Sequence, residues 1–258
     1  MSKVKNEKAR SNRENGKIEK SLGFMSSNSN SNAKIRFYLC RHGQSEFNAK
    51  GILQGHLESP LSPLGITQAQ ALALKAKLWE ISYIVSSHLG RAQQTAHICA
   101  EFLNKEIHHS QRIEPQSTAE LAERHLGAWQ GKAVAQLTEF HQFNTLCYQQ
   151  THLTPPNSLE PDNSPERINS LERIISLGKS ESTDAVRQRM QQALRNIAQT
   201  TGVNADSSSR ELNVLVISHG DALACLMSQF TQPIALNNTQ GMLLTYHHDK
   251  LQWGGLID

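Results

Sequence analysis

The chain has 258 residues, with 26 lysines and arginines against 23 aspartates and glutamates, for a formal net charge of +3. A chain of this length can bury a substantial hydrophobic core without disulfides or metal ions. The positive charge is concentrated in the first 36 residues, where nine basic and three acidic side chains give +6, so the remaining 222 residues carry −3. The composition of the body therefore gives no indication of a nucleic-acid or membrane partner.

Patterns along the chain exclude further protein classes. No run of 18 or more apolar residues occurs, so a transmembrane helix is not predicted. The N-terminus lacks the apolar stretch of a secretory signal. The four cysteines are widely spaced and form no CxxC pair, which favours a reducing, cytoplasmic setting over a disulfide framework.

Two stretches of the chain are expected to lack regular structure. Residues 1–33 are polar, basic and poor in aromatic side chains, and they end in a run of serines and asparagines. This composition predicts a disordered, basic N-terminal tail, followed by one folded domain at 34–258. A cluster of prolines at about 150–180 predicts a long irregular excursion within that domain.

The folded part begins with a predicted strand at 34–40, KIRFYLC, which is rich in strand-forming residues. A helix up to Trp79 is expected to follow, because Ser62 is a typical N-cap and Pro63 suits a first helical turn. The run YIVSS at 83–87 predicts a second strand, and 91–103 a second helix.

The same alternation continues in the second half of the chain. Residues 184–199 place apolar side chains at helical spacing, and the apolar run at 212–218 predicts a strand buried on both faces. A helix is expected at 221–230, and the last two apolar runs predict a closing hairpin. Strands that alternate with helices predict an α/β fold, with three α/β/α layers and a mostly parallel central sheet.

Two of these strands lead into the same dipeptide, the first into His42-Gly43 and the last parallel one into His219-Gly220. Ligands of open α/β sheets bind beyond the carboxyl ends of the strands, so both histidines are expected at one crevice. Arg41, Asn48 and Arg91 lie on the adjoining loop and at a helix start. Because arginines and helix N-termini bind phosphate oxygens, the set predicts a phosphoryl pocket.

The segments around these residues resemble the motifs of a known family. They are RHGQSEFN at 41–48, SSHLGRAQQTA at 86–96, LAERHLGAWQG at 121–131, SESTDAVRQRM at 180–190 and VISHGDAL at 216–223. In order and approximate spacing they are similar to those of the histidine phosphatase superfamily, which includes the phosphoglycerate mutases. Several motifs in order are far more specific than one short pattern. The resemblance covers about residues 34–258 apart from the proline-rich excursion, and it implies a phosphoglycerate mutase-like fold.

The resemblance also implies roles for individual residues. His42 would be the nucleophile that forms a phosphohistidine. Glu123 would protonate the leaving oxygen, since its spacing to Gly127 and Gly131 selects it over Glu120. The other catalytic or phosphate- and substrate-binding positions would be Arg41, Ser45, Asn48, Gln54, Gly55, Arg91, His219 and Gly220. No metal ion or other cofactor is implied.

At other positions the chain departs from the mutases. Their substrate contacts are a Thr-Gly pair, a tyrosine, a lysine, an Arg-Arg pair and a His-Gly-Asn step. The matching residues here are Gln54-Gly55, Leu126, Val134, the stretch 142–144 and His219-Gly220-Asp221. We therefore expect a phosphatase that acts on a small phosphorylated metabolite, with a mutase-type phosphotransferase as the alternative and a catalytically silent binding module as a third. The exact substrate and the oligomeric state stay open, a homodimer included.

Overall fold

The computed structural model describes residues 34–106, 112–156, 180–204 and 211–257. The predicted N-terminal tail at 1–33 lies outside these residues, as does most of the excursion predicted at 150–180. Among the helices of the described ranges, none has the length and apolar character needed to cross a membrane.

A six-stranded sheet forms the centre of the fold, with the strand order β3-β2-β4-β1-β5-β6. Its strands are β1 (Lys34–Arg41), β2 (Tyr83–Ser87), β3 (Gln116–Thr118), β4 (Glu211–Ser218), β5 (Gly241–His247) and β6 (Lys250–Ile257). The first four in this order pair in parallel, and the β5–β6 hairpin is antiparallel. The prediction of a mostly parallel sheet closed by a hairpin is confirmed. Strand β3 was not predicted, because three polar residues give no strand pattern.

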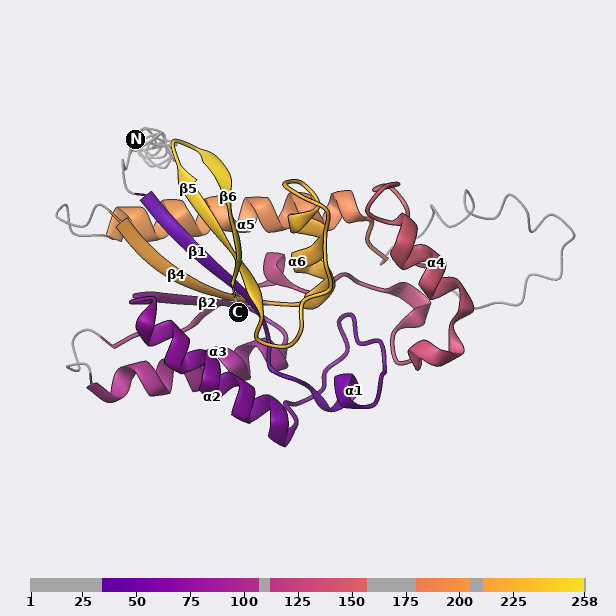
Figure 1. Cartoon of the computed structure of the whole chain (residues 1–258), viewed down its shortest axis with the longest axis horizontal. Coiled ribbons are helices and arrows are strands. Elements are labelled where there is room, and N and C mark those ends of the chain that lie inside the picture. The colour runs from indigo at the N-terminus through magenta and orange to yellow at the C-terminus, as the bar shows by residue number, and fades with distance from the viewer. Residues whose placement is uncertain (1–33, 107–111, 157–179, 205–210, 258) are drawn as a thin grey trace, which may run out of the picture. The chain divides into compact units, whose positions relative to one another are not determined.

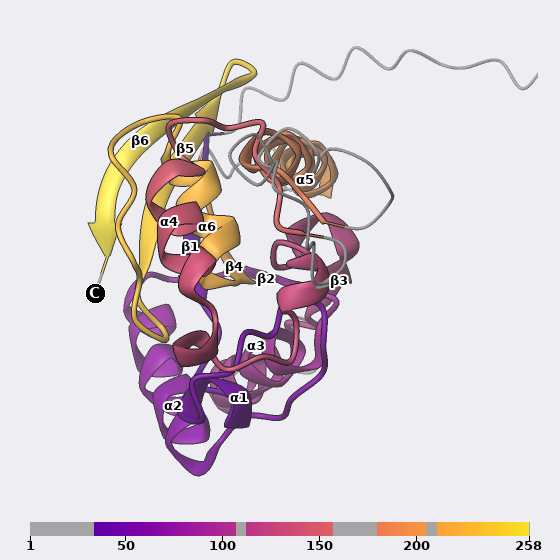
Figure 2. The same ribbon diagram turned by 90° about the vertical axis from the view of Figure 1, so that its right-hand side faces the viewer.

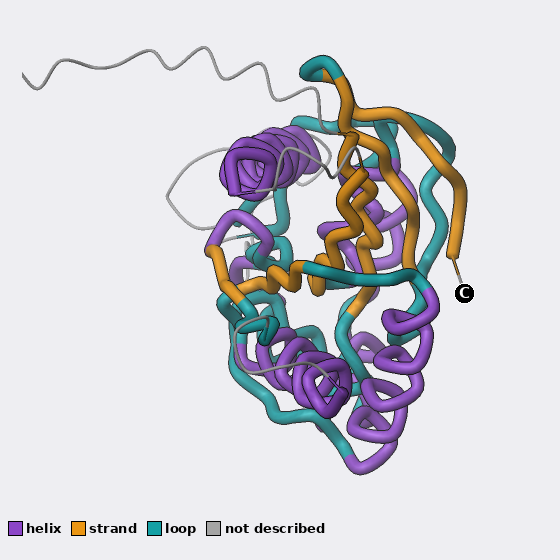
Figure 3. Tube along the Cα trace, turned by 90° about the vertical axis from the view of Figure 1, so that its left-hand side faces the viewer, coloured by secondary structure: helices purple, strands orange, loops and turns teal. Residues whose placement is uncertain are grey.

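Helices cover both faces of this sheet. Helices α2 (Pro63–Leu78) and α3 (Gly90–Leu103) lie on one face, and α5 (Thr183–Asn204) and α6 (Gly220–Met227) on the other (Figures 1 and 3). Successive side chains of a strand point to opposite faces. In β4, Val214 and Val216 therefore pack towards α5 and α6, and Leu215 and Ile217 towards α2 and α3. The predicted three-layer α/β/α fold is confirmed.

The start of helix α2 agrees with the local signals in the sequence. Ser62 accepts a hydrogen bond from the amide of Gly65 at 3.1 Å, and Pro63 opens α2, as predicted. Helix α6 ends at Met227, three residues before the predicted end. Short 3-10 helices occur at Asn104–Glu106, Ala119–Leu121, Gly127–Trp129 and Val134–Gln136.

Two further α-helices, α1 (Glu46–Ala49) and α4 (Thr138–Leu146), were not predicted. Helix α4 lies beside α6 at the end of the sheet (Figure 2). It has a small hydrophobic core of its own, in which the Trp129 ring contacts Phe143 and Phe140 edge-on at centroid distances of 5.2 and 5.7 Å. This core holds α4 in place, and no residue of α4 belongs to the two larger hydrophobic clusters on the faces of the sheet.

The pairing of β1 with β4 positions the two predicted histidines. Their register sets Arg41 opposite Ser218, so the chain leaves both strands at the same level. The amide of His42 also donates to the Ser218 carbonyl at 3.0 Å, which extends the ladder by one residue. The two His-Gly steps therefore emerge side by side at one edge of the sheet, as the sequence predicts.

Candidate active site

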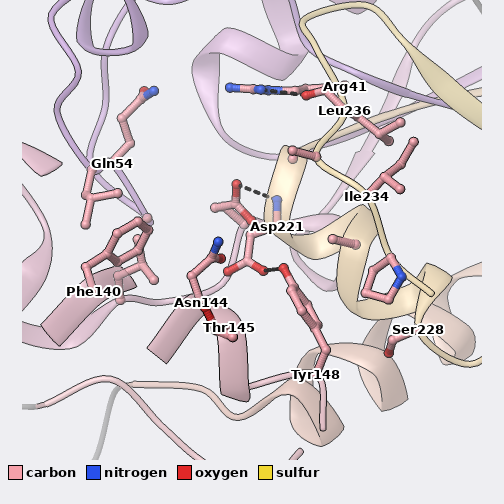
Figure 4. Close-up of a pocket in the computed structure, with 18 of the residues that line it drawn as sticks. Arg41, Gln54, Phe140, Asn144, Thr145, Tyr148, Asp221, Ser228, Ile234 and Leu236 are labelled. Carbon is pink, nitrogen blue, oxygen red and sulfur yellow. Dashed lines mark hydrogen bonds between the residues drawn. The ribbon is translucent and has the colours of Figure 1, made fainter. Parts of the chain in front are cut away.

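A cavity of about 1010 Å³ opens at this edge, beyond the ends of β1 and β4. Its wall includes eight of the residues singled out in the sequence, namely Arg41, His42, Asn48, Gln54, Gly55, Arg91, Glu123 and Gly220. Helix α4 and the segment 228–236 form its outer sides (Figure 4). Two predicted site residues, Ser45 and His219, are fully buried beside the cavity and do not form its wall.

The hydrogen bonds of His42 define its tautomer. Nδ1 of His42 lies 2.6 Å from the carbonyl oxygen of Gly43, which can only accept, so Nδ1 carries the proton. Nε2 is then unprotonated and accepts a hydrogen bond from Nε of Arg91 at 3.1 Å. Burial lowers the pKa of His42 well below 6.5, and the charges of Arg91 and Arg41 lower it further. The ring is therefore neutral, with its lone pair at Nε2.

Arg91 is held by the backbone of the loop that follows α1. Its Nη1 and Nη2 atoms donate to the carbonyls of Leu57 and Gly55 at 3.0 and 2.8 Å. Its position at the second residue of α3 brings it next to His42, and the side chain is almost fully buried. The guanidinium is thus fixed before any substrate arrives, which is the arrangement that stabilises charge on a phosphoryl group most effectively.

Several buried polar atoms of the predicted site residues have no hydrogen-bond partner among the residues that the structure describes. They are Nε of Arg41, Oε1 of Gln54 and both ring nitrogens of His219. The ring of His219 lies edge-on to that of His42, with 5.1 Å between centroids, and burial lowers its pKa well below 6.5. Such atoms are rare in proteins and mark places where a ligand can complete the hydrogen bonding.

Glu123 faces the cavity from the segment between β3 and α4. Its Oε1 atom accepts hydrogen bonds from the amides of Arg124 and Ala222, at 2.9 and 2.8 Å, so the carboxyl is held at the first turn of α6. Burial raises the pKa of Glu123, and the neighbouring Asp221 raises it further. Glu120 is exposed and accepts from the Thr118 hydroxyl, away from the cavity. The structure therefore places Glu123, and not Glu120, where the sequence expects the acid.

Ser45 differs from its predicted role as a substrate-binding group. It caps α1, where its Oγ accepts from the amide of Asn48 at 3.1 Å and from Nε2 of Gln54 at 2.7 Å. Oδ1 of Asn48 in turn accepts from the amide of Ser45 at 3.2 Å. The oxygen of the Asn48 side chain is thus engaged, and Asn48 lines the cavity. Ser45 thus orients two residues of the wall.

Asp221, which stands where the mutases have an asparagine, lies in an ion pair. It pairs with the fully buried Arg124, whose Nε lies 2.7 Å from Oδ2, and it accepts from the Tyr148 hydroxyl at 2.7 Å. Its side chain is one quarter exposed, so one edge still faces the cavity. Burial opposes ionisation, but Arg124 and Tyr148 outweigh it and lower the pKa of Asp221. The buried Arg124–Asp221 pair was not predicted from the sequence.

Arg189 of α5 is a second residue that was missed. It donates to the carbonyls of Ala122 and Glu123, at 2.7 and 3.0 Å, and pairs with Glu181 at 2.7 Å. These bonds fasten the backbone that carries Glu123 to the helix layer. In the sequence, Arg189 stands in an amphipathic helix among other polar residues, and nothing there signals its contact with the site.

The chain also matches a family model. Residues 37–254 match the model described as the histidine phosphatase superfamily (branch 1), which spans most of the chain and all the residues above. The chain belongs to the histidine phosphatase superfamily. The family predicted from the sequence motifs is confirmed, and this histidine phosphatase superfamily member is an enzyme of phosphatase or mutase type.

Curated relatives of both types are similar to this chain. A protein of Photorhabdus laumondii, provisionally named as a phosphoglycerate mutase, is 31% identical over 75% of this chain and 73% of its own length. A protein of Hydrogenobacter thermophilus, provisionally named as a phosphoserine phosphatase, is 29% identical over 75% of this chain and 78% of its own. Identity at this level does not separate the two activities.

Solved structures support the fold. The mycobacterial glucosyl-3-phosphoglycerate phosphatase has a TM-score of 0.62 at 24% identity, with 85% of this chain and 97% of that one covered. A phosphoglycerate mutase of Bacillus anthracis has a TM-score of 0.63 at 19% identity, with 87% and 93% covered. The phosphoglycerate mutase-like fold of this superfamily member is thereby confirmed.

Within the described ranges, no group of three or more histidine, cysteine, aspartate and glutamate side chains is arranged to hold a metal ion. The positive charges that face the phosphoryl pocket are those of Arg41 and Arg91.

Proposed function

We propose that the protein is a phosphomonoesterase, which transfers a phosphoryl group from its substrate to Nε2 of His42 and then to water. The observation that carries this proposal is the lone pair of Nε2, fixed by the Nδ1–Gly43 hydrogen bond and set beside the Arg91 guanidinium. A neutral imidazole in this tautomer is a competent nucleophile, and the adjacent cation attracts the phosphoryl oxygens to it.

In the first step, the Nε2 lone pair forms a bond to phosphorus while the bond from phosphorus to the substrate oxygen breaks. The guanidinium groups of Arg41 and Arg91, the amide of Asn48 and the ring of His219 would hold the three phosphoryl oxygens. Glu123, whose raised pKa favours the protonated form, would give its proton to the leaving oxygen, so that an alcohol departs.

In the second step, water attacks the phosphorus of the phosphohistidine. Glu123, now a carboxylate, would take a proton from that water as the oxygen–phosphorus bond forms and the nitrogen–phosphorus bond breaks. The products are inorganic phosphate, neutral His42 and protonated Glu123, which is the starting state. The two guanidinium groups stabilise the charge in both steps, so we propose that the reaction is independent of metal ions.

The outer contacts favour water over a second substrate as the phosphoryl acceptor. A mutase must retain a phosphorylated acid, and the mutases have an arginine pair for this purpose. The matching stretch 142–144 contains no arginine, and the residue that it contributes to the cavity is Asn144. Leu126 lines the cavity where the mutases have a tyrosine. A mutase-type phosphotransferase is the second candidate, and the relative from Photorhabdus laumondii favours it.

Trapping of the phosphoenzyme tests the proposal. The protein is incubated with 4-nitrophenyl phosphate and a chelator, quenched, and analysed for phosphohistidine by mass spectrometry. We expect phosphate release and a phosphorylated His42 in the wild type and in His97→Asn, an exposed histidine of α3 outside the cavity, and neither in His42→Asn. Loss of activity on chelation, or full activity in His42→Asn, would overturn the mechanism.

The two enzyme candidates are separated by 3-phosphoglycerate supplied with and without its bisphosphate. Release of phosphate without isomerisation supports a phosphatase, whereas fast isomerisation without release would replace it with a mutase. A binding module without catalysis would form no phosphohistidine with any phosphate ester, and the complete set of site residues speaks against it.

We also propose a reducing, cytoplasmic setting for the enzyme. Its four cysteines are free and buried in the structure, which supports a protein that folds without disulfides. An unchanged unfolding temperature with and without a reductant is the expected result.

A further inference from the structure

The cavity has an inner and an outer part with different chemistry. The inner part holds the charged groups of the phosphoryl pocket, at the ends of β1 and β4. The outer wall is formed by Phe140, Asn144, Thr145 and Tyr148 on one side and by the segment 228–236 on the other (Figure 4). A volume of about 1010 Å³ is far larger than a phosphoryl group needs, so the outer wall has to accommodate the alcohol part of the substrate.

The outer wall carries no positive charge within the described residues. The arginines on the cavity, Arg41 and Arg91, both belong to the inner part, and the segment 228–236 contains no charged residue. The Asp221 carboxylate, to which Tyr148 of that wall donates at 2.7 Å, is balanced by the buried Arg124, whose Nε atom lies 2.7 Å from it. Among the described residues, a second anionic group on the substrate would therefore lose its water there without gaining a cation, because the charge of Asp221 is already balanced by Arg124.

The remaining outer surface is apolar with amide and hydroxyl groups. Phe140 presents its ring from a fixed position, because it packs edge-on against Trp129. On the opposite side, Ile234 is 47% exposed, a large fraction for an isoleucine, and Leu236 lies next to it in the cavity. Asn144 and Thr145 add uncharged hydrogen-bonding groups between these two surfaces (Figure 4).

We propose that the site selects a phosphomonoester whose alcohol part is uncharged and partly apolar, and that it discriminates against phosphorylated acids. This inference rests on the proposed phosphatase function and adds the substrate class. Apolar contact with Phe140 and Ile234 favours the neutral alcohol, and an anionic one would be desolvated at the described outer wall without a cation to pair with.

Matched substrate pairs test the inference with the wild-type enzyme. Each pair consists of an acid and its methyl ester: 3-phosphoglycerate with its ester, and 4-carboxyphenyl phosphate with its ester. We expect kcat/KM to be higher for the ester by about tenfold or more in both pairs, mostly through KM, because the carboxylate is desolvated without a cation in the ground state and the transition state alike. Equal values, or a preference for the acids, would overturn the inference.

A gain of charge on the outer wall gives a second test. Asn144→Arg places a cation on the cavity, and Gln142→Arg places the same charge on an exposed position of α4 outside the cavity. We expect Asn144→Arg to reduce the preference for the esters by about tenfold, and Gln142→Arg to leave it unchanged. Equal effects of the two variants would count against the outer wall as the origin of selectivity. Unfolding temperatures show whether both variants are folded.

The failure of the inference is distinguishable from the failure of the proposed function. If the enzyme releases phosphate but prefers the acids, the proposed substrate class is wrong and the proposed phosphatase activity still stands. The absence of release from all four compounds, together with no phosphohistidine from 4-nitrophenyl phosphate, overturns both.

Discussion

Arg91 and His42 are joined by a hydrogen bond of 3.1 Å from Nε of the guanidinium to Nε2 of the ring. The bond requires a neutral ring, since a protonated Nε2 would have a donor facing a donor. The same contact places a cation against the imidazole and helps to lower its pKa. Arg91 therefore holds the His42 ring in its neutral form, with the lone pair on Nε2, the nitrogen that faces the guanidinium.

The pH dependence of kcat/KM follows from the shifted pKa values of His42 and Glu123. Neutral His42 is needed, so activity is lost as pH falls through its pKa, which lies well below 6.5. Protonated Glu123 is needed, so activity is lost as pH rises through its pKa, which lies above 4.5. We expect a maximum on the acidic side of neutrality for an alkyl phosphate, after correction for the second ionisation of the ester at about pH 6. A plateau that extends into the alkaline range would contradict this assignment.

Glu123→Gln is expected to separate substrates by their leaving groups. The amide keeps the size of the side chain but has no proton to give, so an alkyl phosphate should lose about 100-fold or more in kcat. A 4-nitrophenolate leaves without protonation, so 4-nitrophenyl phosphate should lose less than about tenfold in the first step. Burst kinetics isolate that step. Glu120→Gln, at the exposed neighbour, is the matched control and should behave as the wild type.

The fold and the inner site were largely predictable because their signals are local. Continuous apolar strands, the Ser62-Pro63 helix start and the two His-Gly steps each lie within a few residues of sequence. Helix α4 was not predicted, because its apolar side chains pack against Trp129 and not against the main sheet. A short helix with its own core lacks the pattern of a helix that covers a sheet.

The parts of the site that were missed depend on contacts between distant segments. Arg124 and Asp221 are 97 positions apart, and Arg189 reaches the carbonyls of residues 66 and 67 positions away. Each of these arginines looks like an ordinary surface charge in the sequence. Only the fold shows that one neutralises a buried carboxylate and that the other holds the backbone of Glu123.

Arg189→Gln should impair catalysis through the position of Glu123. Loss of the bonds to the carbonyls of Ala122 and Glu123 frees the segment, so kcat for an alkyl phosphate should fall by about 10-fold to 100-fold with little change in KM. Because Glu123 is the affected group, the loss for 4-nitrophenyl phosphate should be smaller. A merely structural role would lower both rates equally. Arg187→Gln, on the same helix, removes an ion pair with Asp184 and is the control.

Asp221→Asn should destabilise the protein, because the fully buried Arg124 loses its counterion. Breaking a buried pair in this way costs about 3–5 kcal/mol in free energy of unfolding, measurable by urea titration. The pKa of Asp221 is lower in the folded state than its ordinary value of 3.8. The carboxylate therefore contributes fully to stability above pH 3.8, and this contribution is lost as the pH falls through the lowered pKa. The acid-side fall in stability should therefore be smaller in the variant. The double variant Arg124→Met/Asp221→Asn should recover part of the loss, and no recovery would mean that Arg124 is not the cause.

Gly43→Ala should disturb the His42 loop, because there is no room for a side chain. A Cβ atom at this position would overlap the carbonyl oxygen of Gly65 at the start of α2, and backbone cannot move aside as a flexible side chain can. We expect a loss of about 1–3 kcal/mol in stability. Activity should fall as well, since the Gly43 carbonyl holds Nδ1 of His42.

Gly51→Ala is the control that separates the steric overlap at position 43 from the backbone strain that any residue other than glycine meets at a positive φ. Gly51 has a φ of +65° and nothing within 4 Å of an added Cβ, so only the backbone strain of about 1–2 kcal/mol applies. Gly43→Ala should therefore lower activity far more than Gly51→Ala at a comparable loss of stability. If both variants lost stability equally and kept full activity, the close approach of the Gly43 loop to α2 would not be needed to position the Gly43 carbonyl that accepts from His42.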